Sequence, residues 1–119
     1  MKMISLNDLR KKLEQTSPLT LLEALPARYF EAGHLPGALH MPHDQVAELA
    51  ASLVPNKDAA IVVYCANQAC QNSHIAAQRL TQLGYRDVSV FADGKQAWSD
   101  AGLELSVDMY ESASFAEVA

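Results

Sequence analysis

The sequence predicts an α/β domain built on a central, mostly parallel β-sheet with helices on both faces. Short runs of β-branched and aromatic residues alternate with segments of helical periodicity along the whole chain. The clearest of these runs, residues 61–64 (IVVY), leads through a loop into a helical pattern near residue 73. With 119 residues the chain is long enough for one domain with its own core, and we treat residues 1–119 as that single domain.

Composition narrows the classes of function. The net charge is −5, and no basic stretch is available to replace the counterions of a phosphate backbone, so we expect no nucleic-acid partner. No apolar run approaches the roughly 18–20 residues of a membrane span, so no membrane partner is expected. The N-terminus lacks the apolar segment of a signal peptide, which predicts a cytoplasmic location. In the cytoplasm the two cysteines are expected to take part in a reaction rather than to cross-link the fold.

The chain begins with a capped helix and a buried strand. Ser5 can cap a helix in which Asp8 takes the capping-box position, and Pro18 closes this segment. Residues 19–25 form a largely apolar run that contains Glu23, and this pattern predicts a buried strand. The simplest interpretation of Glu23 is an ion pair or a helix cap.

The remaining elements alternate between helix and strand. Gly84 is the expected end of the helix that follows the cysteine loop, and Gly102 ends the last helix. Residues 105–119 are a C-terminal tail, which either docks as a short helix or frays. In chain order we predict a helix over 26–32, a turn-rich connector over 33–38, a strand over 39–41, a helix over 45–53, the strand 61–64, a helix over 73–83, a strand over 88–91 and a helix after Gly94.

Cys65 stands where the central strand ends and the loop toward a helix begins. In sheets of this kind the functional crevice lies beyond the carboxyl ends of the strands. The free N–H groups and the positive dipole end of a helix N-terminus favour an anion. Cysteines in such places have pKa values lowered from about 8.5 to roughly 3.5–7.5. We therefore predict that Cys65 is a reactive cysteine.

Four segments resemble known sequence patterns, in the same order and spacing. They are residues 29–38 (YFEAGHLPGA), residues 62–65 (VVYC), residues 76–77 with 83–85 and Val88 (AA, LGY and V), and residues 94–98 with 101–103 (GKQAW and AGL). Together they resemble the single-domain rhodanese family, the sulfurtransferase fold, over about residues 20–104. The resemblance implies a rhodanese-like fold.

The resemblance also implies a function. Cys65 would take a sulfane sulfur from a donor, hold it as a persulfide, and pass it to a thiol or another nucleophilic acceptor. Backbone N–H groups of residues 66–71 are expected to stabilise the negative outer sulfur. The implied partners are a small sulfur-containing donor and a thiol acceptor, which a partner protein can also supply. The implied chemistry needs no cofactor and no metal.

The sequence departs from the family pattern in the cysteine loop. Asn72 stands where the family has an arginine that holds an anionic donor, and the loop from Cys65 is two residues longer than usual. An amide offers neither the charge nor the fork of a guanidinium. We therefore expect a persulfide donor to be preferred over thiosulfate, and the missing arginine argues against a phosphatase. Glu23 replaces the family's aspartate, and Leu25 replaces the arginine that follows it.

Cys70 has two interpretations. Four residues separate it from Cys65, so a curled loop can bring the two sulfur atoms together. In the first interpretation Cys70 is a resolving thiol that attacks the Cys65 persulfide or sulfenate and leaves a reducible disulfide. In the second it is a small loop side chain that fills space or oxidises incidentally.

The histidines have ordinary explanations. His34, His40 and His43 are interpreted as turn or surface residues, and His74 can donate a hydrogen bond to an anionic substrate. His74 and two cysteines do not make a zinc ligand set. The predicted catalytic residues are Cys65 and Cys70, and the predicted substrate-binding loop consists of Ala66, Asn67, Gln68, Ala69, Gln71, Asn72, Ser73 and His74.

The sequence thus predicts a rhodanese-like sulfurtransferase that works through Cys65. The alternative is a non-catalytic binding or redox-sensing module of the same fold, which switches a partner surface through a disulfide between Cys65 and Cys70. Loss of sulfur transfer on replacement of Cys65 distinguishes the first function from the second.

Overall fold

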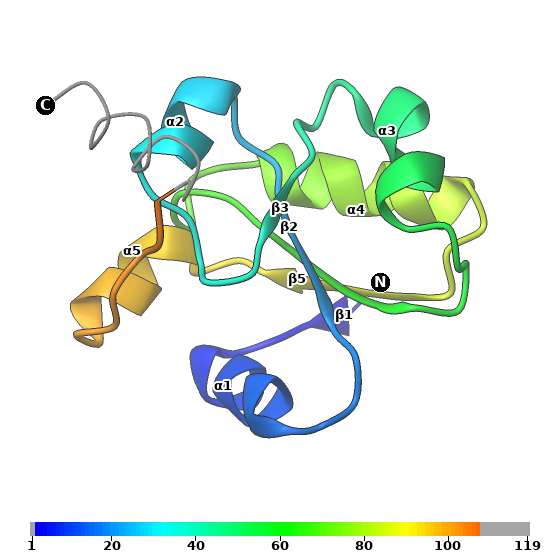
Figure 1. The fold of residues 1–119 in the computed structure, drawn as a ribbon. Helices are drawn as coiled ribbons and strands as arrows, with labels where there is room; N and C mark the ends of the chain where they lie inside the picture. Colours follow the sequence, from blue (N-terminus) through cyan, green and yellow to red (C-terminus); the bar gives the residue numbers. More distant parts are fainter. Residues whose placement is uncertain (1, 108–119) are drawn as a thin grey trace, which may run out of the picture.

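We describe the protein from a computed structural model, in which residues 2–107 are described (Figure 1). These residues form alternating strands and helices over the whole of that range. The elements are β1 (Lys2–Met3), α1 (Leu6–Glu14), β2 (Thr20–Glu23), α2 (Ala27–Ala32), β3 (Leu39–His40), α3 (Val46–Leu53), β4 (Ala60–Tyr64), α4 (Asn72–Gln82), β5 (Asp87–Phe91) and α5 (Gly94–Asp100).

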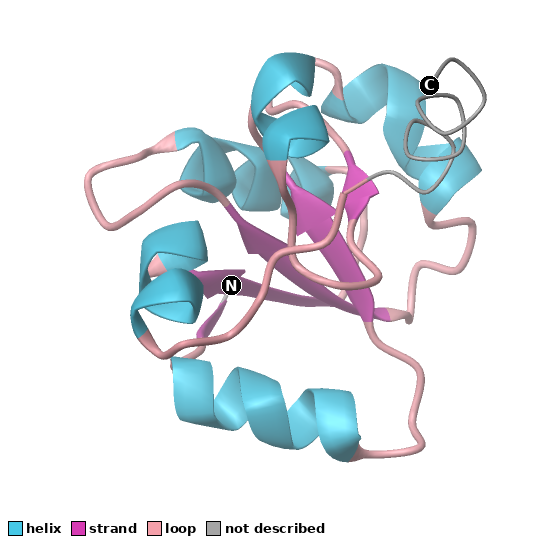
Figure 2. Cartoon of the chain, turned by 60° about the vertical axis from the view of Figure 1, so that its left-hand side comes forward, coloured by secondary structure: helices cyan, strands magenta, loops and turns pink. Residues whose placement is uncertain are grey.

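The strands form one sheet in the order β1-β5-β4-β2-β3. All four pairings are parallel, so the carboxyl ends of the strands meet at one edge. β4 is the central strand, and its last residue, Tyr64, is in register with Glu23 of β2 and Phe91 of β5. The predicted α/β class with a parallel sheet is confirmed (Figure 2).

Helices cover both faces of this sheet. In Figure 1, α1 lies below the sheet and α3 and α4 lie above it. One apolar cluster joins the upper face to α3 and α4, with Leu22, Val63 and Leu80 among its buried members. The other joins the lower face to α1 and α5 through Leu9 and Trp98. Burying both faces is what a parallel sheet requires, and it leaves the carboxyl edge to carry the site.

Strand β1 is not among the elements predicted from the sequence. Lys2 and Met3 pair with Ser89 and Val90 of β5 at the edge of the sheet. Both strand residues are exposed, and a strand of two residues shows neither an apolar alternation nor a buried run. The other predicted elements are present, with ends that differ by a few residues; the strand predicted over 19–25 is Thr20–Glu23.

Local contacts confirm the predicted start of the first helix at Ser5 and the predicted end of α4 at Gly84. The Ser5 hydroxyl accepts a hydrogen bond from the N–H of Asp8 at 3.1 Å, which caps α1. Gly84 follows α4 with a φ of +101°, a backbone conformation that favours glycine. No helix within residues 2–107 combines the length and apolarity that a membrane crossing demands.

The start of the predicted C-terminal tail packs onto the domain. Ser106 and His34 exchange two backbone hydrogen bonds, of 2.9 and 2.7 Å, and Leu105 packs against the lower apolar cluster. The rest of that tail, residues 108–119, lies outside the described residues, so its predicted docking or fraying stays a prediction.

Candidate active site

Cys65 is held rigidly where the central strand ends. Its side chain is fully buried. Its carbonyl oxygen accepts a hydrogen bond from the N–H of Lys95 at 3.0 Å, and the carbonyl of Ala66 accepts one from the N–H of Gln96 at 2.9 Å. The first turn of α5 therefore anchors the backbone on both sides of the Cys65–Ala66 peptide bond. Gly94 permits this approach, because a Cβ there would collide with the Cys65 carbonyl oxygen and its φ is +64°.

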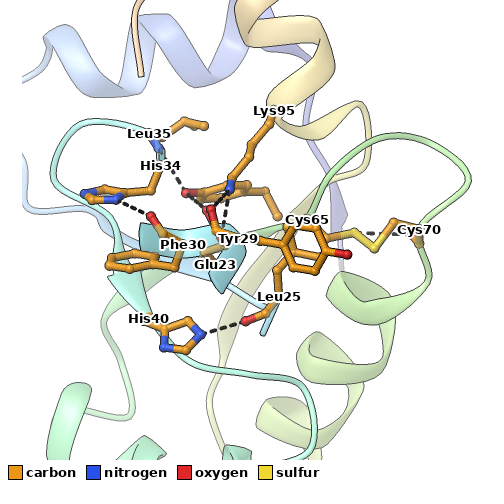
Figure 3. Close-up of polar contacts among 11 residues, drawn as sticks. Glu23, Leu25, Tyr29, Phe30, His34, Leu35, His40, Cys65, Cys70 and Lys95 are labelled. Atoms are coloured by element: carbon orange, nitrogen blue, oxygen red, sulfur yellow. Dashed lines mark hydrogen bonds and ion pairs between the residues drawn. A yellow bond between two sulfur atoms is a disulfide. The ribbon is translucent and has the colours of Figure 1, made fainter. Parts of the chain in front are cut away.

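The loop after Cys65 curls back on itself around Asn67. The Asn67 side-chain oxygen accepts the N–H of Ala69 at 3.0 Å, and its backbone carbonyl accepts the N–H of Cys70 at 3.1 Å. This turn brings the Cα atom of Cys70 to 6.3 Å from that of Cys65, and the two residues form a disulfide (Figure 3). The curled loop that the sequence allows is thus present and brings the two sulfur atoms together, whereas the role of Cys70 stays a prediction.

Ser73 places a hydroxyl beside the sulfur of Cys65. It lies in the first turn of α4, is fully buried, and has its Oγ 3.3 Å from the Sγ of Cys65. A hydroxyl can donate its hydrogen to a sulfur atom, most strongly when the sulfur is anionic. The predicted loop residue Ser73 is thus the side chain that the structure brings into contact with Cys65 from α4.

The other predicted loop residues differ in their placement. Gln68 donates from its amide to a carboxylate oxygen of Asp93 at 2.5 Å. The expected inward N–H groups of Ala69 and Cys70 are engaged by Asn67 in this disulfide form. Four residues of the predicted loop are exposed to solvent: Asn67, Gln68, Ala69 and Gln71. Three others are partly exposed: Ala66, Asn72 and His74.

A cavity of about 370 Å³ adjoins the loop. Its polar groups include the carboxylates of Asp93 and Asp100 and the amides of Asn67, Gln68 and Gln96. Each carboxylate already accepts an amide hydrogen bond, from Gln68 and Gln96 respectively. Two carboxylates therefore line this cavity next to the cysteine loop.

A buried charge cluster adjoins the backbone of Cys65, through Tyr64 and Lys95. Glu23 is fully buried; its Oε1 accepts the Tyr64 hydroxyl at 2.8 Å, and its Oε2 lies 2.9 Å from the Nζ of Lys95 (Figure 3). The Tyr64 oxygen in turn accepts the N–H of Leu35 at 3.0 Å, and Lys95 also donates to the carbonyl of Tyr29 at 2.8 Å. Burial, and then the charge of Glu23, raise the pKa of Tyr64 well above its usual value of 10.

Of the two roles considered for Glu23, the ion pair is the one present, but its partners were not predicted. Lys95 is 72 positions away in the chain, and no local pattern links it to Glu23. Tyr64 was recognised only as a strand residue. The one available indication was a carboxylate at the end of an otherwise apolar strand, because a buried charge needs a partner.

Two of the histidines make hydrogen bonds to backbone carbonyl groups. The Nδ1 of His34 donates to the carbonyl of Phe30 at 3.0 Å, and the two rings stack with their centroids 4.0 Å apart. The Nε2 of His40 donates to the carbonyl of Leu25 at 2.6 Å. Within residues 2–107, no group of three or more His, Cys, Asp or Glu side chains is placed to hold a metal ion.

The sheet is parallel, and a cysteine loop follows the carboxyl end of its central strand. These features define an α/β domain with a cysteine site at the edge of its sheet. Residues 5–101 match the model of the rhodanese-like domain. The chain belongs to the rhodanese-like domain family, which confirms the resemblance found in the sequence.

Three similar proteins illustrate the family. The chain is 33% identical over 89 residues to the HTH-type transcriptional regulator Rv0324 of Mycobacterium tuberculosis, covering 75% of this chain and 38% of that protein. It is 25% identical over 96 residues to the putative sulfur carrier protein YrkF of Bacillus subtilis, covering 81% and 50%. The crystal structure of thiosulfate sulfurtransferase from Pseudomonas aeruginosa matches with a TM-score of 0.80 and 30% identity, over 91% of this chain and 20% of that one. The chain therefore spans half or less of each of these relatives.

Proposed function

We propose that the protein is a sulfurtransferase that carries sulfane sulfur as a persulfide on Cys65. The observation that carries the proposal is the placement of the Cys65 sulfur, buried at the carboxyl edge of the sheet and 3.3 Å from the Ser73 hydroxyl. The first turn of α4, with its dipole and unpaired N–H groups, favours negative charge on this sulfur or on one bonded to it. Membership of the rhodanese-like family and the sulfurtransferase and sulfur-carrier relatives support the proposal.

The reaction consists of two sulfur transfers. The Cys65 thiolate attacks the terminal sulfur of a donor persulfide, the S–S bond of the donor breaks, and the donor leaves as a thiolate. An acceptor thiolate then attacks the outer sulfur of the Cys65 persulfide, and Cys65 leaves as a thiolate. One sulfane sulfur passes from donor to acceptor with no net oxidation, so the balance requires no cofactor.

The surroundings of the loop favour a low-molecular-weight or protein persulfide over thiosulfate. Asn72 occupies the first position of α4, where it brings no positive charge. Lys95 lies nearby, but its ammonium group is committed to Glu23 and its side chain is only 14% exposed. The adjoining cavity carries Asp93 and Asp100, which repel a dianion.

The test is steady-state sulfur transfer from a low-molecular-weight persulfide, or from thiosulfate, to a thiol acceptor. We expect a higher kcat/KM with the persulfide, and loss of transfer in Cys65→Ser. Asn72→Arg supplies the missing charge and is expected to raise kcat/KM for thiosulfate selectively. Gln78→Arg, on an exposed position of the same helix, adds the same charge away from the loop and serves as the matched control. Transfer that survives in Cys65→Ser would refute the proposal.

A further inference from the structure

We propose that Cys70 is a resolving thiol, which gives the protein a second activity: reductive release of sulfide from the Cys65 persulfide. This inference rests on the proposed function, because it requires sulfane sulfur to arrive on Cys65. The persulfide then has two fates. It passes its outer sulfur to an acceptor, or Cys70 converts it to a disulfide and sulfide.

The atoms and electrons of this step balance within the chain. The Cys70 thiolate attacks the inner sulfur of the persulfide, which is the Sγ of Cys65. The bond from this Sγ to the outer sulfur breaks, and the outer sulfur leaves as hydrosulfide with the electron pair. The sulfane sulfur is thereby reduced to sulfide, and the two cysteine thiols are oxidised to one disulfide. An external dithiol, itself oxidised to a disulfide, restores both cysteines.

The loop holds Cys70 close enough to Cys65 for its sulfur to attack the Cys65 sulfur. Asn67 makes the turn with both its side-chain oxygen and its backbone carbonyl. The resulting Cα separation between Cys65 and Cys70, 6.3 Å, lies within the roughly 4.4–6.8 Å that a disulfide spans. The product of the proposed step is the bond that the structure contains.

The two cysteines differ in exposure, and this difference favours a repeated cycle of disulfide formation and reduction. Cys65 is fully buried beside the Ser73 hydroxyl, whereas Cys70 is partly exposed. An external thiol therefore reaches the sulfur of Cys70, and Cys65 is the leaving group. The Ser73 hydroxyl and the start of α4 stabilise the departing thiolate. Reduction thus returns Cys65 directly to the thiolate that accepts the next sulfur.

The test is a single turnover without reductant. Fully reduced protein is mixed anaerobically with a small excess of cysteine persulfide, and free sulfide is measured in the mixture against a Cys65→Ser/Cys70→Ser blank. The protein is then desalted, and its intact and peptide masses are recorded. We expect the wild type to release about one equivalent of sulfide per chain and to lose the mass of two hydrogen atoms, as the conversion of two thiols to a disulfide requires. Cys70→Ser is expected to retain one added sulfur atom on Cys65 and to release no sulfide.

Each outcome decides between the two claims. A wild type that keeps the persulfide on Cys65 as long as Cys70→Ser does would overturn the resolving role and leave the proposed function intact. An adduct on Cys70→Ser that has the mass of the whole donor thiol would overturn the resolving role as written, because the disulfide would then arise without a persulfide. Cys70→Ser that takes up no sulfur at all would refute the proposed function instead. Gln78→Ser, on the exposed face of α4, controls for the substitution and is expected to behave as the wild type does.

Discussion

Ser73 is the side chain through which the fold acts most directly on the Cys65 sulfur. Its hydroxyl is buried, so it does not exchange this contact for water. A hydrogen bond to a charged group contributes about 1.5–3 kcal/mol, more than a bond between neutral groups. In the proposed chemistry this contribution stabilises Cys65 whenever its sulfur bears negative charge, as the attacking thiolate and as the leaving group.

Removal of this hydroxyl is expected to slow the chemistry of Cys65 without unfolding the protein. In a Cys70→Ser background, Ser73→Ala should lower the rate constant for iodoacetamide alkylation of Cys65 at neutral pH by roughly tenfold, which corresponds to about 1.4 kcal/mol. Ser52→Ala, on an exposed position of α3, is the matched control and should leave the rate unchanged. Equal alkylation rates in the two variants would show that the Ser73 contact does not act on the thiolate.

Tyr64 is the second residue whose environment has a measurable consequence. Its raised pKa means that the folded protein holds the phenol proton to a higher pH than the unfolded chain does. The contribution to stability is therefore complete below about pH 10, the unperturbed value, and is lost as the pH rises above it.

Tyr64→Phe is expected to change both the size and the pH dependence of stability. At neutral pH it should lower the free energy of unfolding by about 1–3 kcal/mol, because a buried oxygen of Glu23 and the N–H of Leu35 lose their partner. Urea unfolding at a series of pH values should show the gap between wild type and variant narrowing above about pH 10. A gap that stays constant into the alkaline range would contradict the assigned cause.

At the scale of elements, the Glu23–Lys95 pair joins the end of β2 to the start of α5. The same lysine donates its side-chain hydrogens to Tyr29 at α2 and its backbone N–H to the carbonyl of Cys65. The ion pair therefore fixes α5, and α5 fixes the peptide bond that follows Cys65. A buried pair of this kind holds a geometry even where its net contribution to stability is small.

Breaking this pair from one side should be costly. Lys95→Met leaves the fully buried Glu23 carboxylate with no cation and is expected to lower the free energy of unfolding by about 3–5 kcal/mol. Glu23→Gln should cost less, since an amide still accepts the Tyr64 hydroxyl and Lys95 is partly exposed. The double variant is expected to be more stable than Lys95→Met alone. Additive losses in this double-mutant cycle, measured by urea unfolding, would show that the two side chains are not coupled.

At the scale of the whole molecule, the sequence predicts the architecture because its patterns are local. The run at residues 61–64, the helical spacing after it and the glycine at position 84 each specify one element, and alternation of such elements defines a parallel sheet. Cys65 follows from the same logic, since it ends the central strand. Two exposed residues at the sheet edge carry no such pattern, and β1 was missed for that reason.

The partners within the site depend on the fold rather than on local sequence. The carboxylate of Glu23 in an apolar strand predicts that it has a partner, but not which one. Tyr64 and Lys95 contact Glu23 only because β2 and β4 end side by side and α5 begins next to them. The turn around Asn67 likewise becomes visible only in three dimensions. A sequence pattern can therefore place Cys65 at the end of the central strand, whereas the groups that surround it come from elements that are distant in the chain.

The most direct test of the central claim is to locate the transferred sulfur. Cys70→Ser is loaded with a low-molecular-weight persulfide, desalted without reductant, alkylated and digested, and the cysteine peptide is sequenced by mass spectrometry. We predict one additional sulfur atom on Cys65, and its loss to an added thiol acceptor, which recovers the unmodified residue. A Cys65 peptide without added sulfur, in protein that remains folded and whose Cys65 is alkylated, would contradict the account.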